Sequence, residues 1–424
     1  MVSGKHVSNR PSNWRITPPF RRSNVFTFKV LKMNDKKTED PNSGDMIIAN
    51  QRHLFSIPEE VTYLNCANMS PFMKTVEEAG GLAIGQRRQP WTISAGQWFS
   101  PAEELRSLFA GLIGAEKEQI ALIPSVSYGI AIAKNNIKLE PSQKIVVLDQ
   151  EYPSNLYAWR ELSGESGAEI VTVQRAGDGS WTEAVLQQID EATGLVAISN
   201  CHWTDGSLID LEQVSRKVRQ VGARLVIDAS QSLGAYPLDV RKIRPDFLVT
   251  VGYKWLMGPY NLGYLYADPK YAQAGRPIEF SWMVKAGSDD FTRLVEYTDD
   301  YKPGARRFDA GEFASFIHIP MAAAALSQIT AWGVENIQAT LSRLTGAISA
   351  GVRDLGLKAP PQESRVGHMM GIPFPAEKID GVRKKLVENN IYISFRGSSM
   401  RIAPHLYNDE RDVQRLLQVL GKGG

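Results

Sequence analysis

A lysine stands directly after an apolar, β-branched run in the stretch VTVGYKWLMGP, residues 249–259. A second apolar run, residues 224–230, carries Asp228 and Ser230 at its end, and Gln231 follows. If both runs are strands of an open parallel sheet, their polar ends lie at the edge where such sheets bind ligands, beyond the carboxyl ends of the strands. We therefore expect Lys254 and Asp228 to face one crevice.

The combination of this amine and this carboxylate indicates a particular chemistry. Alone, Lys254 would be a solvated residue and Asp228 a turn or a helix cap. Together they suit a site for pyridoxal phosphate, in which the lysine forms a Schiff base with the aldehyde. The aspartate keeps the pyridine nitrogen protonated, so that the ring can accept electrons from a substrate carbanion.

The elements that must position these residues form a regular pattern. Apolar runs of strand length recur at residues 144–149, 169–173, 195–200, 224–230, 247–251 and 262–267. Helix-like segments lie between several of them, such as residues 182–190 and residues 210–221, where Asp210 is a suitable N-cap. Apolar strands that alternate with amphipathic helices predict an α/β fold with a mostly parallel sheet, covered by helices on both faces.

The pattern also predicts the domain organisation. Residues 35–45 are typical of a solvated linker, the alternation of strands and helices is lost over residues 268–305, and a new helical pattern begins near residue 319. We predict an extension over residues 1–45 that is disordered or not native to the protein, with Met33 or Met46 as the natural start in the second case. A large cofactor-binding domain over residues 46–305 follows, with its first residues packed on the small domain. The smaller C-terminal α+β domain covers residues 306–424.

Composition excludes several classes of protein. No apolar run approaches the roughly 18 residues needed to span a bilayer, so we expect no membrane partner. The first 37 residues carry nine Lys/Arg and one acid, and since the whole chain has a net charge of +2, its body is mildly acidic and no nucleic-acid binder. Two cysteines, six scattered histidines and the absence of CxxC and HExxH predict a reducing compartment and no metal site. We expect a cytoplasmic location, with organellar import through the basic head as the alternative.

The region between the two key residues resembles a known family. Residues 199–266, which begin SNCHWTDGS and end LGYLY, are similar to the core of the class V aminotransferase family, which includes cysteine desulfurases, kynureninases and isopenicillin N epimerase. The D-x-x-Q of residues 228–231 and the G-Y-K of residues 252–254 carry the resemblance, which extends more weakly from about residue 63 to about residue 420. It implies the type I fold of pyridoxal phosphate enzymes, with a seven-stranded sheet, and a homodimer with active sites near the subunit interface.

The resemblance assigns cofactor contacts. Lys254 matches the Schiff-base lysine, and Asp228 matches the partner of the pyridine nitrogen. His202 stands where the family often has an asparagine near the ring hydroxyl, and it is expected to be catalytic with these two. The other implied cofactor contacts are Gln231 near the ring hydroxyl, Tyr152 stacked on the ring, Tyr253 and the helix start with Val126 and Ser127 at the phosphate, and Ser230. Without the resemblance, Tyr152 would be explained as well by core packing and Ser127 by helix capping.

The resemblance also assigns substrate contacts. The segment FRGSSMRIAPHLYN, residues 395–408, resembles the one that bears the carboxylate-binding arginine, and Arg401 matches that residue. Arg396 is a weaker candidate. The segment YLNCANMSP, residues 63–71, places Ala67 and Asn68 near the substrate. One departure is Glu312, which stands where a threonine often contacts the phosphate and which would repel it.

The implied activity is that of an aminotransferase-type enzyme, which uses pyridoxal phosphate and acts on an amino acid through Schiff-base exchange at Lys254 and abstraction of the α-proton. A β-lyase, a C–S lyase or a kynureninase-like hydrolase is the alternative within this chemistry. A catalytically silent binding protein with the same fold is the alternative from another class. Desulfurase activity is not expected, because no cysteine lies between Arg365 and Arg401 and because Tyr152 replaces the stacking histidine.

Overall fold

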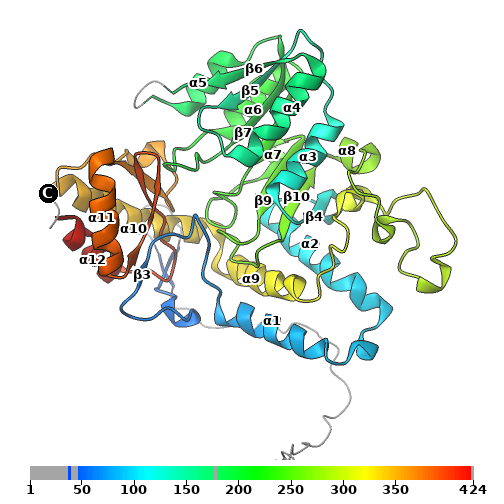
Figure 1. Cartoon of the computed structure of the whole chain (residues 1–424), viewed down its shortest axis with the longest axis horizontal. Coiled ribbons are helices and arrows are strands. Elements are labelled where there is room, and N and C mark those ends of the chain that lie inside the picture. The colour runs from blue at the N-terminus through cyan, green and yellow to red at the C-terminus, as the bar shows by residue number, and fades with distance from the viewer. Residues whose placement is uncertain (1–36, 40–45, 176–178, 422–424) are drawn as a thin grey trace, which may run out of the picture. The chain divides into compact units, whose positions relative to one another are not determined.

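The computed structural model describes residues 37–39, 46–175 and 179–421 (Figure 1). Most of the predicted N-terminal extension lies outside the described residues. None of the described helices is long and apolar enough to cross a membrane. The α-helices are α1 (Lys74–Gln86), α2 (Ser100–Ile113), α3 (Val126–Asn136), α4 (Tyr157–Ser166), α5 (Trp181–Gln188), α6 (Leu211–Gln220), α7 (Val240–Ile243), α8 (Pro269–Ala274), α9 (His318–Trp332), α10 (Val334–Asp354), α11 (Ile379–Glu388) and α12 (Glu410–Gly421).

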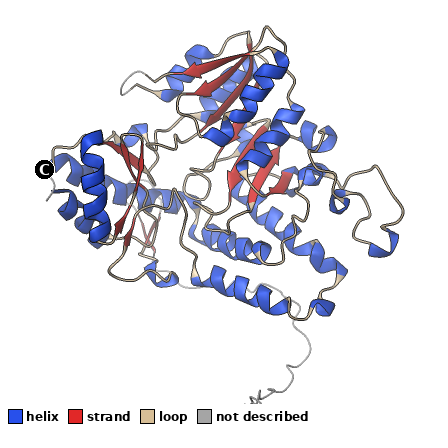
Figure 2. Cartoon of the chain, in the orientation of Figure 1, coloured by secondary structure: helices blue, strands red, loops and turns tan. Residues whose placement is uncertain are grey.

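The strands fall into separate groups, which Figure 2 shows in red. They are β1 (Lys37–Glu39), β2 (Met46–Ile48), β3 (Thr62–Tyr63), β4 (Ile120–Ile123), β5 (Lys144–Leu148), β6 (Glu169–Val173), β7 (Thr193–Ser199), β8 (Arg224–Asp228), β9 (Phe247–Val251), β10 (Gly263–Ala267), β11 (Met370–Pro373), β12 (Ile391–Tyr392), β13 (Ser394–Arg396) and β14 (Ser399–Ile402).

The large sheet has seven strands in the order β4-β10-β9-β8-β7-β5-β6. Strands β5 to β9 pair in parallel, and β10 runs antiparallel to both of its neighbours, β9 and β4. The predicted α/β fold with a mostly parallel seven-stranded sheet is therefore confirmed. Strand β4 is not predicted from the sequence, because its four residues are too few to show a period.

Helices cover both faces of this sheet, because alternate residues of each strand point to opposite sides. Val146 and Ile227 belong to a core that includes residues of α2, α5, α6 and α9. Val147 and Val226 belong to a second core, which includes residues of α3 and α4. Asp210 caps α6 as predicted, since its side chain accepts a hydrogen bond from the backbone N–H of Gln213.

The chain after the large sheet forms a second group of strands and helices. Strands β11, β14 and β13 form an antiparallel sheet, and β12 pairs in parallel with β3 from the start of the chain. The core of this group joins residues of α10, α11, α12 and these strands. Strand β2 contacts α10, whereas α9 contacts α1 and α2. The predicted boundary between residues 305 and 306 stays a prediction.

Candidate active site

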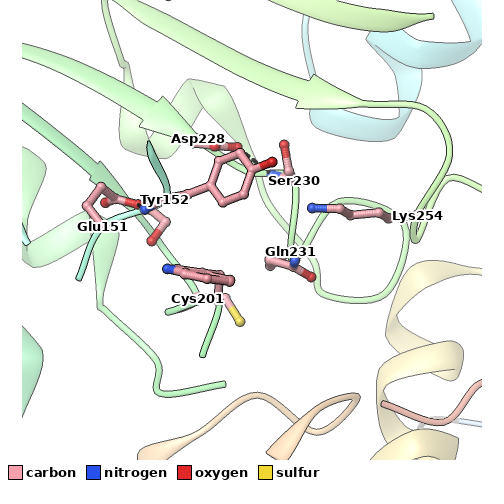
Figure 3. A pocket seen from close by; sticks show the side chains of 9 residues that line it. Glu151, Tyr152, Cys201, Asp228, Ser230, Gln231 and Lys254 are labelled. Atoms are coloured by element: carbon pink, nitrogen blue, oxygen red, sulfur yellow. Dashed lines mark hydrogen bonds between the residues drawn. The ribbon is translucent and has the colours of Figure 1, made fainter. Parts of the chain in front are cut away.

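A small pocket, partly open to solvent, lies at the carboxyl ends of the parallel strands. Ser199 ends β7 and is paired in register with Asp228, which ends β8, and Asp228 is in turn paired with Val249 of β9. Lys254 follows the end of β9. The pocket is lined by Glu151, Tyr152, Ser199, Cys201, Trp203, Asp228, Ser230, Gln231 and Lys254 (Figure 3).

The Lys254 side chain is buried, with 7% of its surface exposed. Its Nζ lies 5.4 Å from the centre of the Tyr152 ring and 5.9 Å from that of the Tyr253 ring, and no described residue accepts a hydrogen bond from it. Burial lowers the pKa of Lys254 to about 8, although the nearby charge of Asp228 acts in the opposite direction. The amine is thus neutral at pH 7 far more often than an exposed lysine, and the neutral amine is the form that attacks an aldehyde.

Asp228 provides the acidic group of the pocket. Its carboxylate is buried, and Oδ1 accepts a hydrogen bond of 2.9 Å from the backbone N–H of Ser230. Burial raises the pKa of Asp228. A cation beside this carboxylate, such as a protonated pyridine nitrogen, would favour its ionised form. The structure therefore brings Lys254 and Asp228 together in one pocket.

Two aromatic side chains form a wall of the pocket. The rings of Tyr152 and Trp203 meet edge to face, with their centres 5.6 Å apart. The indole Nε1 of Trp203 donates to the backbone oxygen of Gln150 at 2.7 Å, which holds the indole beside the end of β5. Tyr152 is a predicted site residue, and its ring offers a flat face of the size of a pyridine ring.

Gln231 connects the pocket to the N-terminal substrate segment. Its Nε2 donates to the backbone oxygen of Ala67 at 3.1 Å, and its Oε1 accepts from Nε1 of Trp255 at 3.1 Å. Ala67 is buried and the neighbouring Asn68 is exposed. Neither residue lines the pocket itself, and their predicted contact with substrate stays a prediction.

Both candidate arginines lie beside Trp203. Arg401 is 1% exposed, and it donates from Nη1 to the backbone oxygen of Trp203 at 2.7 Å and from Nε to Oγ of Ser394 at 3.0 Å. Its Nη2 is buried without a hydrogen-bond partner. Arg396 donates from Nη2 to Oδ1 of Asn68 at 3.2 Å, and its Cζ lies 5.7 Å from the centre of the Trp203 ring. Burial and the charge of Arg396 lower the pKa of Arg401 to about 9.

The structure does not bring His202 into the pocket lining. Its Nε2 is hydrogen-bonded to the backbone oxygen of Asp149 at 3.0 Å and its Nδ1 to Oγ1 of Thr204 at 2.7 Å. The imidazole stacks on Trp181, with ring centres 5.1 Å apart. Because both nitrogens are occupied within the protein, this geometry gives no support to a catalytic or cofactor-binding role for the His202 side chain.

The residues predicted to hold the phosphate lie outside the lining of this pocket. Strand β4 runs parallel to β9, so α3 begins at the same edge of the sheet as the pocket. Ser127 is exposed in the first turn of α3, whereas Val126 packs in the core and can contribute only its backbone N–H. The Tyr253 ring packs on Tyr260, with centres 4.7 Å apart.

Four lining residues were missed by the site prediction: Glu151, Ser199, Cys201 and Trp203. Glu151 is 5% exposed, its Oε1 accepts from the backbone N–H of Tyr152 at 2.8 Å, and its Oε2 is buried without a partner. Burial and the charge of Asp228 raise the pKa of Glu151 to about 8. Its place immediately before Tyr152, after an apolar run, is a signal that the sequence offers. Burial raises the pKa of the Cys201 thiol, which keeps it neutral.

The pocket residues fit a pyridoxal phosphate group. Buried polar groups in proteins are nearly always hydrogen-bonded, yet Oε2 of Glu151, Oγ of Ser199 and Oγ of Ser230 have no partner in this structure. These three atoms, an amine, a carboxylate and an aromatic face surround one space. A polar heteroaromatic aldehyde supplies partners for each of these groups. Among the described residues, no group of His, Cys, Asp and Glu is placed to hold a metal ion.

Comparison with known proteins agrees with this geometry. The model of the family described as aminotransferase class-V matches residues 94–416. An uncharacterised aminotransferase of Bacillus subtilis is 26% identical over 316 residues, which cover 74% of this chain and 82% of that protein. A probable cysteine desulfurase of Pyrococcus abyssi is 24% identical, with 75% and 82% covered. Isopenicillin N epimerase of Amycolatopsis lactamdurans is 24% identical over 404 residues, with 88% and 97% covered.

Solved structures share the fold. The apo structure of a cysteine desulfurase from Thermococcus onnurineus superposes with a TM-score of 0.77 at 22% identity, covering 88% of this chain and 96% of that one. A complex of the cystine C–S lyase C-DES with its product cysteine persulfide superposes with a TM-score of 0.76 at 18% identity, covering 86% and 98%. Because the family model spans most of the sequence, this chain belongs to the class V aminotransferase family of pyridoxal phosphate enzymes.

Proposed function

We propose that this enzyme is a transaminase-type protein that exchanges the amino group of an amino acid. The observation that carries the proposal is the buried, unpaired amine of Lys254 in the same pocket as the buried carboxylate of Asp228. When bound, pyridoxal phosphate supplies an aldehyde and a ring that accepts electrons from the substrate's α-carbon.

Each pocket residue has a separate role in the proposed reaction. Lys254 would hold the aldehyde of the bound cofactor, and its free amine would be the base for the proton on the substrate's α-carbon, which a pKa of about 8 allows near neutral pH. Asp228 holds a proton on the ring nitrogen by offering it a buried carboxylate. Tyr152 and Trp203 flank the pocket and keep water from the reacting atoms.

Arg401 binds the substrate carboxylate in this proposal. Its buried Nη2 lacks a partner, while its Nη1 and Nε are fixed by Trp203 and Ser394. A guanidinium fixed in this way is already oriented, so little side-chain entropy is lost when a carboxylate binds. Asn68 is exposed beside the neighbouring Arg396, whereas Ala67 is buried and supports Gln231 through its backbone oxygen.

The proposal includes a homodimer in the cytoplasm. Support for the dimer comes from aromatic side chains exposed on the segment between α8 and α9, among them Phe280 at 68% and Tyr297 at 98% exposed. A second copy of the chain would remove this apolar surface from water. Light scattering of the purified enzyme tests the dimer, and a mass that does not exceed one chain would contradict it.

The test of the reaction has two readouts. The enzyme is loaded with pyridoxal phosphate, reduced with borohydride and digested, and we expect mass spectrometry to find the cofactor on the peptide that contains Lys254. A cofactor label elsewhere, or none, would overturn the proposal.

The loaded enzyme is next incubated with a panel of amino acids. A transaminase yields a keto acid and the aminated cofactor in equal amounts, and a second keto acid restores the cofactor. Release of free ammonia with no aminated cofactor would identify a β-lyase or C–S lyase instead.

A further inference from the structure

Two arginines share one side of the pocket without an acidic partner. Arg401 donates to the backbone oxygen of Trp203, and the guanidinium of Arg396 lies over the ring of the same residue. Within residues 37–39, 46–175 and 179–421, neither guanidinium has a carboxylate oxygen within 4.0 Å. Neither arginine is among the residues that line the pocket, but both contact Trp203, which does, and both charges act on Lys254.

Two other arginines that lie partly or fully out of water are neutralised by carboxylates, whereas the buried Arg365 donates only to neutral oxygens of Thr345 and Val366. Arg106 forms an ion pair with Asp309, and Arg175 forms one of 2.8 Å with Asp205. The cost of taking a guanidinium out of water is normally offset by such a carboxylate. The missing acids at Arg396 and Arg401 therefore leave two positive charges for a ligand to neutralise.

The two charges also act on each other and on the catalytic amine. The charge of Arg396 is among the causes that lower the pKa of Arg401, and both arginines contribute to the lowered pKa of Lys254. The acids of the pocket do not balance them, since Asp228 faces the ring nitrogen in the proposed function and burial keeps Glu151 protonated at pH 7. One substrate carboxylate would neutralise one of the two guanidinium groups.

We propose that Arg396 and Arg401 bind two separate anionic groups, so that this enzyme prefers amino acids whose side chain carries a carboxylate or a similar oxyanion. This inference rests on the proposed function, because it assigns the α-carboxylate to Arg401.

The positions of the two arginines support this division. Arg401 is almost completely buried and is fixed by hydrogen bonds from two of its nitrogens. Arg396 is only partly buried, and its partner Asn68 is exposed, so Arg396 lies nearer to solvent. The α-carboxylate, which every amino acid carries, therefore suits the fixed Arg401. The side chain, which varies between amino acids, suits the outer Arg396.

The first test measures binding without reaction. The affinity of the loaded enzyme for succinate is compared with that for butyrate by calorimetry, because the two acids have the same carbon chain and differ by one carboxylate. We expect succinate to bind at least about tenfold more tightly, as the additional charge-assisted hydrogen bonds would predict. Equal affinities for the two acids would overturn the inference.

Variants separate recognition from a structural role. Arg396→Gln should abolish the preference for succinate and leave butyrate binding unchanged, and Arg396→Lys should keep part of the preference because it keeps the charge. Arg293→Gln is the matched control, since it removes one positive charge from an exposed residue that pairs with Glu296. If Arg396→Gln weakened the binding of succinate and of butyrate equally, Arg396 would serve only to hold Asn68, and the inference would fail.

The second test compares kcat/KM for aspartate with asparagine and for glutamate with glutamine. We expect the acidic member of at least one pair to be favoured about tenfold or more, and Arg396→Gln to remove that difference. If the neutral amino acids react equally well on an enzyme that carries the cofactor at Lys254, this inference fails and the proposed function stands. If the cofactor is not found at Lys254, the proposed function fails, while the succinate measurement still reports on the two arginines.

Discussion

Two regions of this molecule bury ionisable side chains, and their hydrogen bonding differs. In the first, Arg106 of α2 donates from Nη1 to Oδ1 of Asp309 and to the backbone oxygen of Ile120, both at 2.8 Å, and from Nε to Oε1 of Glu103 at 3.0 Å. Oδ1 of Asp309 also accepts from the backbone N–H of Leu122 at 2.7 Å. This cluster joins α2 and β4 to the residues that precede α9, and its charges are paired.

In the second region, the pocket, burial is similar but pairing is incomplete. The amine of Lys254 has no partner among the described residues, and Nη2 of Arg401 and Oε2 of Glu151 are buried without one. An unpaired buried polar group costs about 1–3 kcal/mol, and more if it is charged. Unpaired buried polar groups that converge on one pocket are typical of a site that a ligand completes. The paired cluster should therefore determine stability and the pocket should determine chemistry.

The largest expected effect comes from Lys254→Ala. Turnover should be abolished, because no other described amine lines the pocket. The Tm should not fall, because the amine makes no hydrogen bond to lose and its burial is unfavourable while it is charged. Steady-state kinetics and a thermal melt of the same preparation measure both quantities.

The exposed Lys384→Ala provides the control for this variant, since Lys384 lies on α11 with 78% of its side chain exposed. Activity that survives in Lys254→Ala would remove this residue from the mechanism. A large fall in its Tm would show that the amine has a structural role, and the contrast between the two regions would be lost.

The paired cluster should respond in the opposite way. Arg106→Met leaves the buried carboxylate of Asp309 without its cation, so we expect the free energy of unfolding to fall by about 3–5 kcal/mol, as measured by urea denaturation. The double variant Arg106→Met/Asp309→Leu should recover part of this loss, because it removes both charges. A single variant as stable as the wild type would show that this ion pair does not hold the region together.

Arg401→Ala should act mainly on substrate binding. Loss of a buried partner for a carboxylate costs about 2–5 kcal/mol, so KM for amino acids should rise far more than kcat falls. Ser394→Ala is the matched control, because it removes only the hydroxyl that accepts from Nε of Arg401. A fall in kcat with KM unchanged would contradict the assignment of Arg401 to the substrate carboxylate.

The sequence predicts the fold and the centre of the site, because both depend on local pattern. Apolar runs indicate the strands, and the polar residues after them meet because neighbouring strands β8 and β9 are parallel. The sequence alone therefore assigns Lys254 and Asp228 to one crevice.

The rest of the site depends on the orientation of side chains and on the order of strands in the sheet, which the sequence pattern does not show. His202 follows a strand end as the pattern requires, but its ring turns to Asp149 and Thr204 and packs on Trp181. Glu151 is buried because β5 lies beside β7 in the sheet, an order that skips β6 along the chain. The positions of apolar runs in the sequence give neither the orientation of a side chain nor the order of the strands in the sheet.

The pH dependence of two glutamates gives the finest test of the contrast. Burial and Asp228 raise the pKa of Glu151 from 4.5 to about 8, whereas Arg306 and Arg106 outweigh partial burial and lower the pKa of Glu103 to about 2. The contribution of Glu151 to stability is therefore present below pH 4.5 and is lost as the pH rises to 8. The contribution of Glu103 is present above pH 4.5 and is lost as the pH falls to 2.

Two matched substitutions separate these windows. Relative to Glu151→Gln, the wild type should lose unfolding free energy steadily as the pH rises from 5 to 8, because the folded state binds a proton there that the unfolded state has released. Relative to Glu103→Gln, the wild type should change little in that range and should lose stability only at more acidic pH. Urea titrations at several pH values measure both differences. Parallel pH profiles for the two variants would mean that the pocket and the paired cluster hold their carboxylates alike, and the distinction between a site kept for a ligand and a site closed by its own charges would not stand.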